Sequence, residues 1–166
     1  MRTPERRPIP ILLAALILTS IAAIGRAADD PSPFGRRHAV LSPGTTHYYN
    51  QQGAVSGRST SDPAGNIHFY GSSGALTGRA TTEGATTRYY DSAGAYAGHA
   101  VRDNTGGIRY YDRNGAPAGH AAGGGAGQTN FYDPSGKYVG HVHAPQAGVS
   151  HFYDHSGALV GRATSQ

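Results

Sequence analysis

The sequence predicts an all-β protein, an antiparallel meander of repeated β-hairpins of about 21 residues each that form a twisted or curled sheet. Two observations carry this prediction. No stretch after residue 28 has helical periodicity with start and stop signals, and the 25 glycines of the chain disfavour helix. Six related units also follow one another at nearly constant spacing, beginning at His47, His68, Arg88, Arg109, Asn130 and His151. A parallel β-solenoid with one coil per unit is the alternative fold.

Residues 1–28 have the three parts of a secretory signal peptide. Arg2, Arg6 and Arg7 precede an apolar run over 9–24, and small residues follow around position 27. We expect cleavage and export to the periplasm or the extracellular space, with no membrane span in the mature chain. An uncleaved membrane anchor is the alternative, because the apolar run nearly reaches the length that a thin bilayer needs.

The remaining chain divides into a proline-rich flexible arm over 29–46 and the six-unit repeat domain over 47–166. The chain has no cysteine, which excludes disulfides. Its net charge of +4 comes mostly from the export segment. From residue 28 onward ten Lys or Arg face nine Asp or Glu, a balance of +1, so we expect no nucleic-acid partner.

Unit three illustrates the pattern of all six units. Tyr90 is followed four residues later by Gly94 and eight residues later by Gly98, and then comes His99. The stretch 86–90 is predicted to be a strand, 91–94 a turn in which the glycine supplies a positive φ, and 95–102 the return strand. A second turn over 104–107 leads into the next unit.

The register of each hairpin decides which side chains are buried. In a regular ladder across the turn, the aromatic residue before each tyrosine pairs with the residue six positions after that tyrosine. These pairs are Tyr48 with Val55, Phe69 with Leu76, Tyr89 with Tyr96, Tyr110 with Pro117, Phe131 with Tyr138 and Phe152 with Leu159. We expect this face, joined by Ile67 and Ile108, to be buried, with the second glycine making room for the ring. Pro117 predicts an interrupted return strand in unit four.

The opposite face carries the candidate binding residues. They are the tyrosine of each unit and the Arg or His nine residues after it, namely Tyr49, Tyr70, Tyr90, Tyr111, Tyr132, Tyr153, Arg58, Arg79, His99, His120, His141 and Arg162. Tyrosine rings stack on sugars or apolar groups, and arginine binds carboxylate, sulfate or phosphate. Packing of a glycine-rich sheet is the alternative role of the rings.

The cation after the second glycine varies together with the residue two positions before the tyrosine. Where the earlier residue is His, as in His47, the later one is Arg, as in Arg58; where the earlier one is Arg or Asn, the later one is His. All six units follow this exchange. We expect the two positions to be diagonal neighbours on one face, where two arginines would repel each other. Duplication of two ancestral unit types would produce the same pattern.

The stretch Tyr-Asp-x-x-Gly, at Tyr90, Tyr111, Tyr132 and Tyr153, resembles the YD repeats of Rhs and teneurin proteins. Those repeats have a similar period and often carry Leu two residues after the glycine, as Leu76 does here. The resemblance covers residues 47–166 and implies consecutive antiparallel hairpins, extracellular adhesion and carbohydrate contact. This chain departs from the family where Asn or Gly replaces the Asp in its first two units, and six units are too few to enclose a toxin.

Catalysis needs a unique set of residues, whereas a repeat provides six near-copies. No nucleophile elbow or recognisable triad is present, so we expect no enzyme activity, no catalytic residue and no cofactor. His141 and His143, with His120 or His99, are the sharpest candidates for metal ligands. Equivalent residues of successive hairpins lie about 9.5 Å apart, too far to share one ion, so we expect no metal site unless the fold is a solenoid.

The sequence therefore predicts a non-catalytic exported protein that binds a glycan or another acidic polymer of the cell envelope or its surroundings. The alternative is a structural protein without a small ligand, which associates with copies of itself through its sheet edges.

Overall fold

A computed structural model describes residues 44–166, and within them every regular element is a strand. The expected signal peptide and all but the last three residues of the expected arm lie outside the described part. The strands are β1 Thr45–Asn50, β2 Val55–Ser61, β3 Ile67–Gly71, β4 Leu76–Glu83, β5 Thr86–Asp91, β6 Tyr96–Arg102, β7 Ile108–Asp112, β8 Pro117–Gly125, β9 Gln128–Tyr132, β10 Tyr138–Gln146, β11 Val149–Asp154 and β12 Leu159–Ser165. Among these residues no helix is long and apolar enough to cross a membrane.

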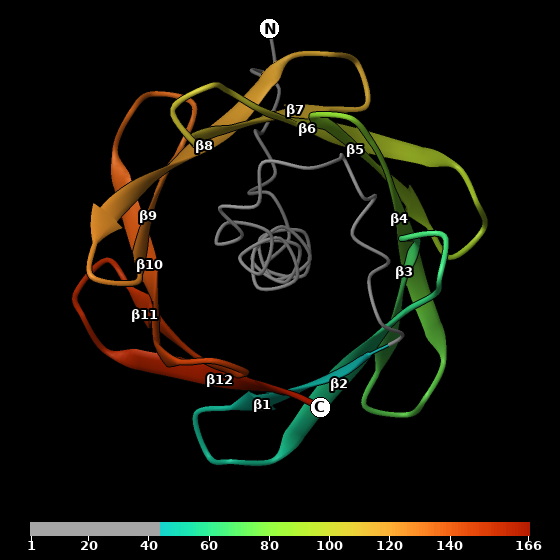
Figure 1. Ribbon diagram of the computed structural model, residues 1–166, viewed down its shortest axis with the longest axis horizontal. Helices are drawn as coiled ribbons and strands as arrows, with labels where there is room; N and C mark the ends of the chain where they lie inside the picture. The colour runs from blue at the N-terminus through green and yellow to red at the C-terminus, as the bar shows by residue number, and fades with distance from the viewer. Residues whose placement is uncertain (1–43) are drawn as a thin grey trace, which may run out of the picture. The chain divides into compact units, whose positions relative to one another are not determined.

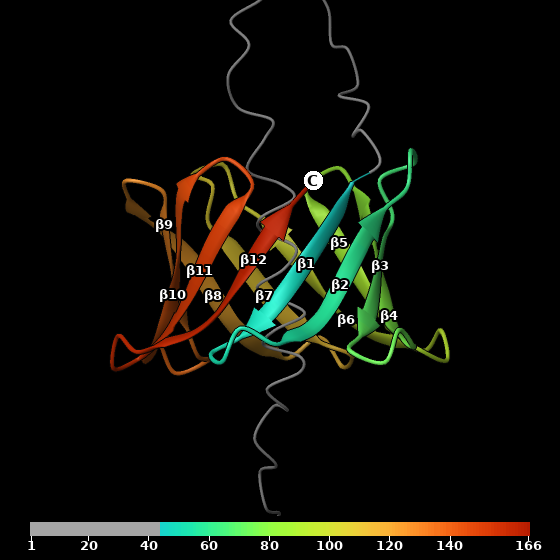
Figure 2. The ribbon, with the colours of Figure 1, turned by 90° about the horizontal axis from the view of Figure 1, so that it is seen from below.

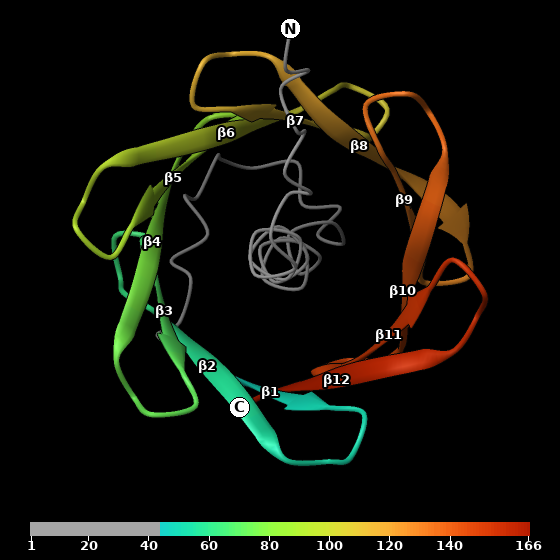
Figure 3. The same cartoon turned by 180° about the vertical axis from the view of Figure 1, so that it is seen from behind.

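The twelve strands form an antiparallel meander that closes on itself (Figures 1 and 3). Each strand pairs with its neighbours in sequence, and β1 also pairs with β12, from Thr46 opposite Ser165 to Asn50 opposite Gly161. The prediction of an antiparallel meander is confirmed. The open twisted or curled sheet and the parallel solenoid are wrong, because tight turns reverse the chain at every strand and the last strand pairs with the first.

The two kinds of turn lie at opposite rims of the barrel (Figure 2). Asp112 shows how the turn inside a unit is held. Its Oδ1 accepts hydrogen bonds from the backbone N–H groups of Asn114 and Ala116, at 2.8 and 2.9 Å. Gly115 has a φ of +80°, which a residue with a Cβ adopts only at a cost. The aspartates of the repeat are thus occupied in shaping turns.

The turn inside each unit is one residue longer than expected, which shifts the register by one residue, and a β-bulge beside each unit tyrosine shifts it by one more. The tyrosine of each unit, and not the residue before it, pairs with the residue six positions later, as Tyr49 does with Val55 and Tyr70 with Leu76. The expected pairs Tyr48 with Val55, Phe69 with Leu76, Tyr89 with Tyr96, Tyr110 with Pro117, Phe131 with Tyr138 and Phe152 with Leu159 are therefore wrong. Val55, Leu76 and Leu159 share the face of the unit tyrosines and are 41–50% exposed.

The aromatic residue before each unit tyrosine instead lies opposite the second glycine, as Phe69 does with Gly78 and Tyr110 with Gly119. This face holds the buried side chains Ile67, Phe69, Tyr89, Ile108, Tyr110, Phe131, Val142 and the alanines 80, 100, 121 and 163. Among the described residues no second layer covers the convex outside of the closed sheet, so side chains on the outside stay exposed. The buried side chains therefore line the inside of the barrel. The expected burial is thus confirmed for the aromatic residues Phe69, Tyr89, Tyr110 and Phe131 and for Ile67 and Ile108, but not for the residues expected to pair with them, which are exposed or, at Tyr138, half-buried. The second glycine makes room for a backbone carbonyl of the neighbouring strand and not for a ring.

Candidate functional site

The twelve candidate binding residues form one set of pairs on the outside of the barrel, here called the outer belt. Each cation lies directly opposite the tyrosine of the next unit, across the seam between two units. The pairs are Arg58 with Tyr70, Arg79 with Tyr90, His99 with Tyr111, His120 with Tyr132, His141 with Tyr153 and Arg162 with Tyr49. The last pair closes the belt, because it joins unit six to unit one.

Every pair in the belt is stacked. The guanidinium carbons of Arg58, Arg79 and Arg162 lie 4.6, 4.7 and 4.9 Å from the centres of the opposite tyrosine rings, within the range of cation–π contacts. The three imidazoles lie 4.7 Å from the opposite rings and are inclined to them by 12–13°. One half of the belt thus carries permanent charges, and the other half carries imidazoles.

The second glycine explains how the seams come so close. A Cβ on Gly57 would lie 2.5 Å from the backbone oxygen of Tyr70, and one on Gly161 would lie 2.6 Å from that of Tyr49. The corresponding glycines of the other units face the next unit's tyrosine carbonyl in the same way. Any side chain at this position would separate the strands and move the following cation away from its tyrosine.

The exchange between Arg and His occurs between residues directly opposite each other within a hairpin. His47 lies opposite Arg58, and Arg88 lies opposite His99. The expectation that they are diagonal neighbours is wrong, because the longer turn and the bulge together shift the pairing by two residues. In each hairpin an arginine therefore faces a histidine, or Asn130 faces His141, and no two arginines are paired.

Carboxylates contribute little to the outer belt. Within residues 44–166 the ion pair that forms joins Arg88 to Glu83, at 2.9 Å and with both side chains exposed. Hydrogen bonds from Ser135 and Ser156 hold the pKa values of Asp133 and Asp154 below their usual value, and both aspartates cap turns at the rim. Arg58, Arg79 and Arg162 are exposed and have no carboxylate within ion-pairing distance among the described residues.

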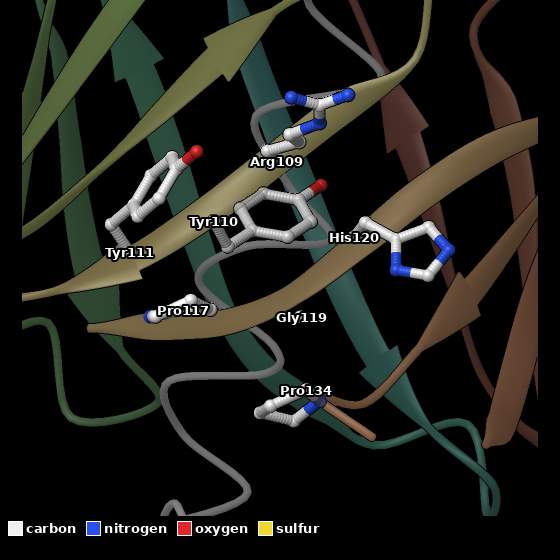
Figure 4. Close-up of a pocket in the computed structure, with 7 residues that line it drawn as sticks. All are labelled: Arg109, Tyr110, Tyr111, Pro117, Gly119, His120 and Pro134. Atoms are coloured by element: carbon white, nitrogen blue, oxygen red, sulfur yellow. The ribbon is translucent and has the colours of Figure 1, made fainter. Parts of the chain in front are cut away.

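A hollow of about 390 Å³ lies beside Pro117 in unit four, and sequence reasoning missed it (Figure 4). It is lined by Arg109, Tyr110, Tyr111, Pro117, Gly119, His120 and Pro134. Only Tyr111 and His120 of these were candidates. The sequence signal that points to this hollow is Pro117, which stands where units three and five have a tyrosine. The predicted interruption of the return strand is wrong, since β8 begins at Pro117 and continues to Gly125.

Each of the histidines considered as candidate metal ligands lies against a different residue. His141 is stacked on Tyr153, and His143 lies opposite His151. Within the described strands and turns no group of three His, Asp or Glu side chains is arranged to hold a metal ion. No protein-family model matches the chain, and no curated protein matches it.

Proposed function

We propose that the protein is a non-catalytic exported binding protein whose outer belt holds an acidic glycan or another acidic polymer. The observation that carries the proposal is the set of exposed arginines in three neighbouring units, Arg162, Arg58 and Arg79, each stacked on a tyrosine ring. A stacked guanidinium loses less conformational freedom when it binds a carboxylate or sulfate group.

The spacing of these arginines suits a linear polymer. Equivalent positions of neighbouring units are two strands apart, which places them roughly 9.5 Å from each other around the barrel. Several weak contacts along one chain then add up, because each later contact is intramolecular. The tyrosine rings orient the arginines, so sugar stacking on the free parts of the rings is a secondary contribution.

Retention on immobilised polygalacturonate, compared with neutral dextran, tests the proposal. We expect the chain to be retained on the acidic polymer at low salt, both at pH 5.5 and at pH 7.5, and to be released as the salt concentration rises. R79Q should weaken retention, and R58Q/R79Q/R162Q should abolish it. R113Q is the matched control, since Arg113 is an exposed turn residue outside the belt. Absence of retention on acidic polymers at both pH values would sink the proposal.

A second candidate function is assembly with copies of the same chain. Every described strand is paired on both sides, so association through sheet edges would require a seam to open. An exposed apolar group near the rim of the unit turns favours assembly through that rim instead: Val55, Leu76, Tyr96, Val139, Leu159 and Val160 are 40–50% exposed. Light scattering that shows a strict monomer at high concentration would count against this candidate.

A further inference from the structure

The hollow in unit four occupies the place of a ring that the two flanking units contain. In units three and five the residue six positions after the unit tyrosine is itself a tyrosine. Tyr96 lies edge-on to Tyr90 with 6.1 Å between the ring centres, and Tyr138 lies edge-on to Tyr132 at 6.0 Å. In unit four the equivalent residue, opposite Tyr111, is Pro117. The neighbouring units thus show what the hollow lacks, namely a phenol ring against the edge of Tyr111.

The histidine of unit four lacks the hydrogen bond that its counterparts have. The hydroxyl of Tyr96 shares a hydrogen bond with Nδ1 of His99 at 2.8 Å, and Tyr138 does the same with His141 at 2.7 Å. Proline has no hydroxyl, and no side-chain hydrogen bond from the described residues reaches His120. His120 is nevertheless held like His99, with the same 4.7 Å and 12° to the tyrosine across its seam. Its ring nitrogen is therefore positioned for an outside hydroxyl group.

The surroundings of the hollow add an exposed cation and apolar walls. Arg109 lies directly opposite His120, so the guanidinium and the imidazole border the same end. The equivalent Arg88 of unit three is ion-paired with Glu83, whereas Arg109 is exposed and forms no such pair in the described residues. Pro117 and the turn residue Pro134 line the other end (Figure 4).

We propose that this hollow binds a phenol group from outside the chain. The ring takes the place that Tyr96 and Tyr138 occupy in units three and five, edge-on to Tyr111 and between the prolines. The hydroxyl bonds to the ring nitrogen of His120, and Arg109 favours phenols that ionise readily. A small phenolic compound and a tyrosine side chain of another protein share this chemistry. The site does not depend on the proposed polymer binding, which uses the arginines of other units.

Titration of the intact protein, followed by NMR of the histidine side chains, tests the inference. The probes are 4-cyanophenol, a small acidic phenol, and N-acetyltyrosinamide, a tyrosine side chain without free charge. We expect the His120 resonances to shift on binding. Benzonitrile and N-acetylphenylalaninamide lack the hydroxyl and should bind roughly three- to tenfold more weakly, the effect of one hydrogen bond. R109Q should reduce the preference for 4-cyanophenol over phenol.

Two variants at Pro117 fill the hollow from within. P117Y should supply both the ring and the hydroxyl and abolish binding, and P117F should block the hollow with the ring alone. L76Y is the matched control, because Leu76 has the same position in unit two, away from the hollow. Circular dichroism confirms that each variant is folded.

Tighter binding of 4-cyanophenol supports a small phenolic ligand, and tighter binding of the tyrosine derivative supports a protein partner. Binding of neither probe, or equal binding to a folded P117Y variant, overturns the inference. The inference is also overturned if glucuronate displaces both phenols at a concentration lower than theirs, because the hollow would then be a sugar site. Retention on polygalacturonate is measured separately, so the two proposals fail independently.

Discussion

The guanidinium carbon of Arg162 lies 4.9 Å from the centre of the Tyr49 ring, and this contact joins the last strand to the first. Arg58 and Arg79 make the same contact with Tyr70 and Tyr90 inside the chain. The seam that closes the barrel is therefore built like the seams between consecutive units. The stability of the closing seam can be tested by substituting Gly161, the residue that lets the first and last strands approach each other.

Gly161→Ala should open the closing seam. A Cβ at this position would lie 2.6 Å from the backbone oxygen of Tyr49, so either strand must move. We expect the free energy of unfolding to fall by about 1–3 kcal/mol in urea denaturation. Gly123→Ala is the control, since Gly123 lies in β8 and a Cβ added there would have no atom within 4 Å. An equal loss in the two variants would contradict the close approach at the seam.

Tyr110→Phe should leave the protein as stable as before or stabilise it by about 1 kcal/mol. The Tyr110 hydroxyl is buried and has no hydrogen-bond partner within the described residues, and burial raises its pKa far above the usual value. Tyr48→Phe, at the equivalent position of unit one, should instead destabilise by about 1 kcal/mol, because the Tyr48 hydroxyl bonds to Ser59 at 2.8 Å. Thermal unfolding of both variants measures the difference, and a larger loss for Tyr110→Phe would refute the unpaired hydroxyl.

Ala126→Gly should raise the free energy of unfolding by about 1 kcal/mol. Ala126 lies in the turn between β8 and β9 with a φ of +47°, a conformation that glycine adopts without strain from a Cβ. Ala147, in the turn between β10 and β11, is the control. Its φ is not positive, so Ala147→Gly should add only flexibility to the unfolded chain and lower stability. Chemical denaturation of the two variants should show changes of opposite sign.

Acid should weaken the turns at Asp133 and Asp154. Hydrogen bonds from Ser135 and Ser156 lower the pKa values of these carboxyl groups in the folded state. Each carboxylate therefore contributes stability above the unfolded pKa, about 4, and this contribution is lost as the pH falls through the lower folded value. D133N/D154N should keep the turns, since Asn50 caps the turn of unit one through the same oxygen. Its melting temperature should fall less than that of the parent chain between pH 5 and pH 2.

The strands, the turns and the division into two faces could be predicted from the sequence, because each depends on neighbouring residues. Asp112 and Gly115 signal a turn, and Phe69 and Ile67, two residues apart, signal a buried face. The hairpin register could not be predicted with the same reasoning, since a shorter turn and a regular ladder were assumed, whereas the turn holds one more residue and the bulge inserts another.

Closure of the barrel could not be predicted from the sequence either. It depends on the sum of small rotations between twelve strands, and no single residue signals it. The candidate residues Arg162 and Tyr49 were recognised, but their contact joins opposite ends of the domain. In unit four the sequence drew attention to Pro117, although the consequence is a hollow and a histidine without the tyrosine hydroxyl that His99 and His141 bond, rather than a broken strand.

Because β12 pairs with β1, the barrel does not depend on which unit comes first in the chain. The backbone N–H of Gln166 donates to the carbonyl of Thr45 at 3.0 Å, so the two ends of the described chain meet at one rim. A circular permutant, with these ends linked and new ends opened at a turn between other units, would keep every seam. A duplicated unit, in contrast, would add two strands and widen the barrel, so the inner aromatic side chains would no longer fit one another.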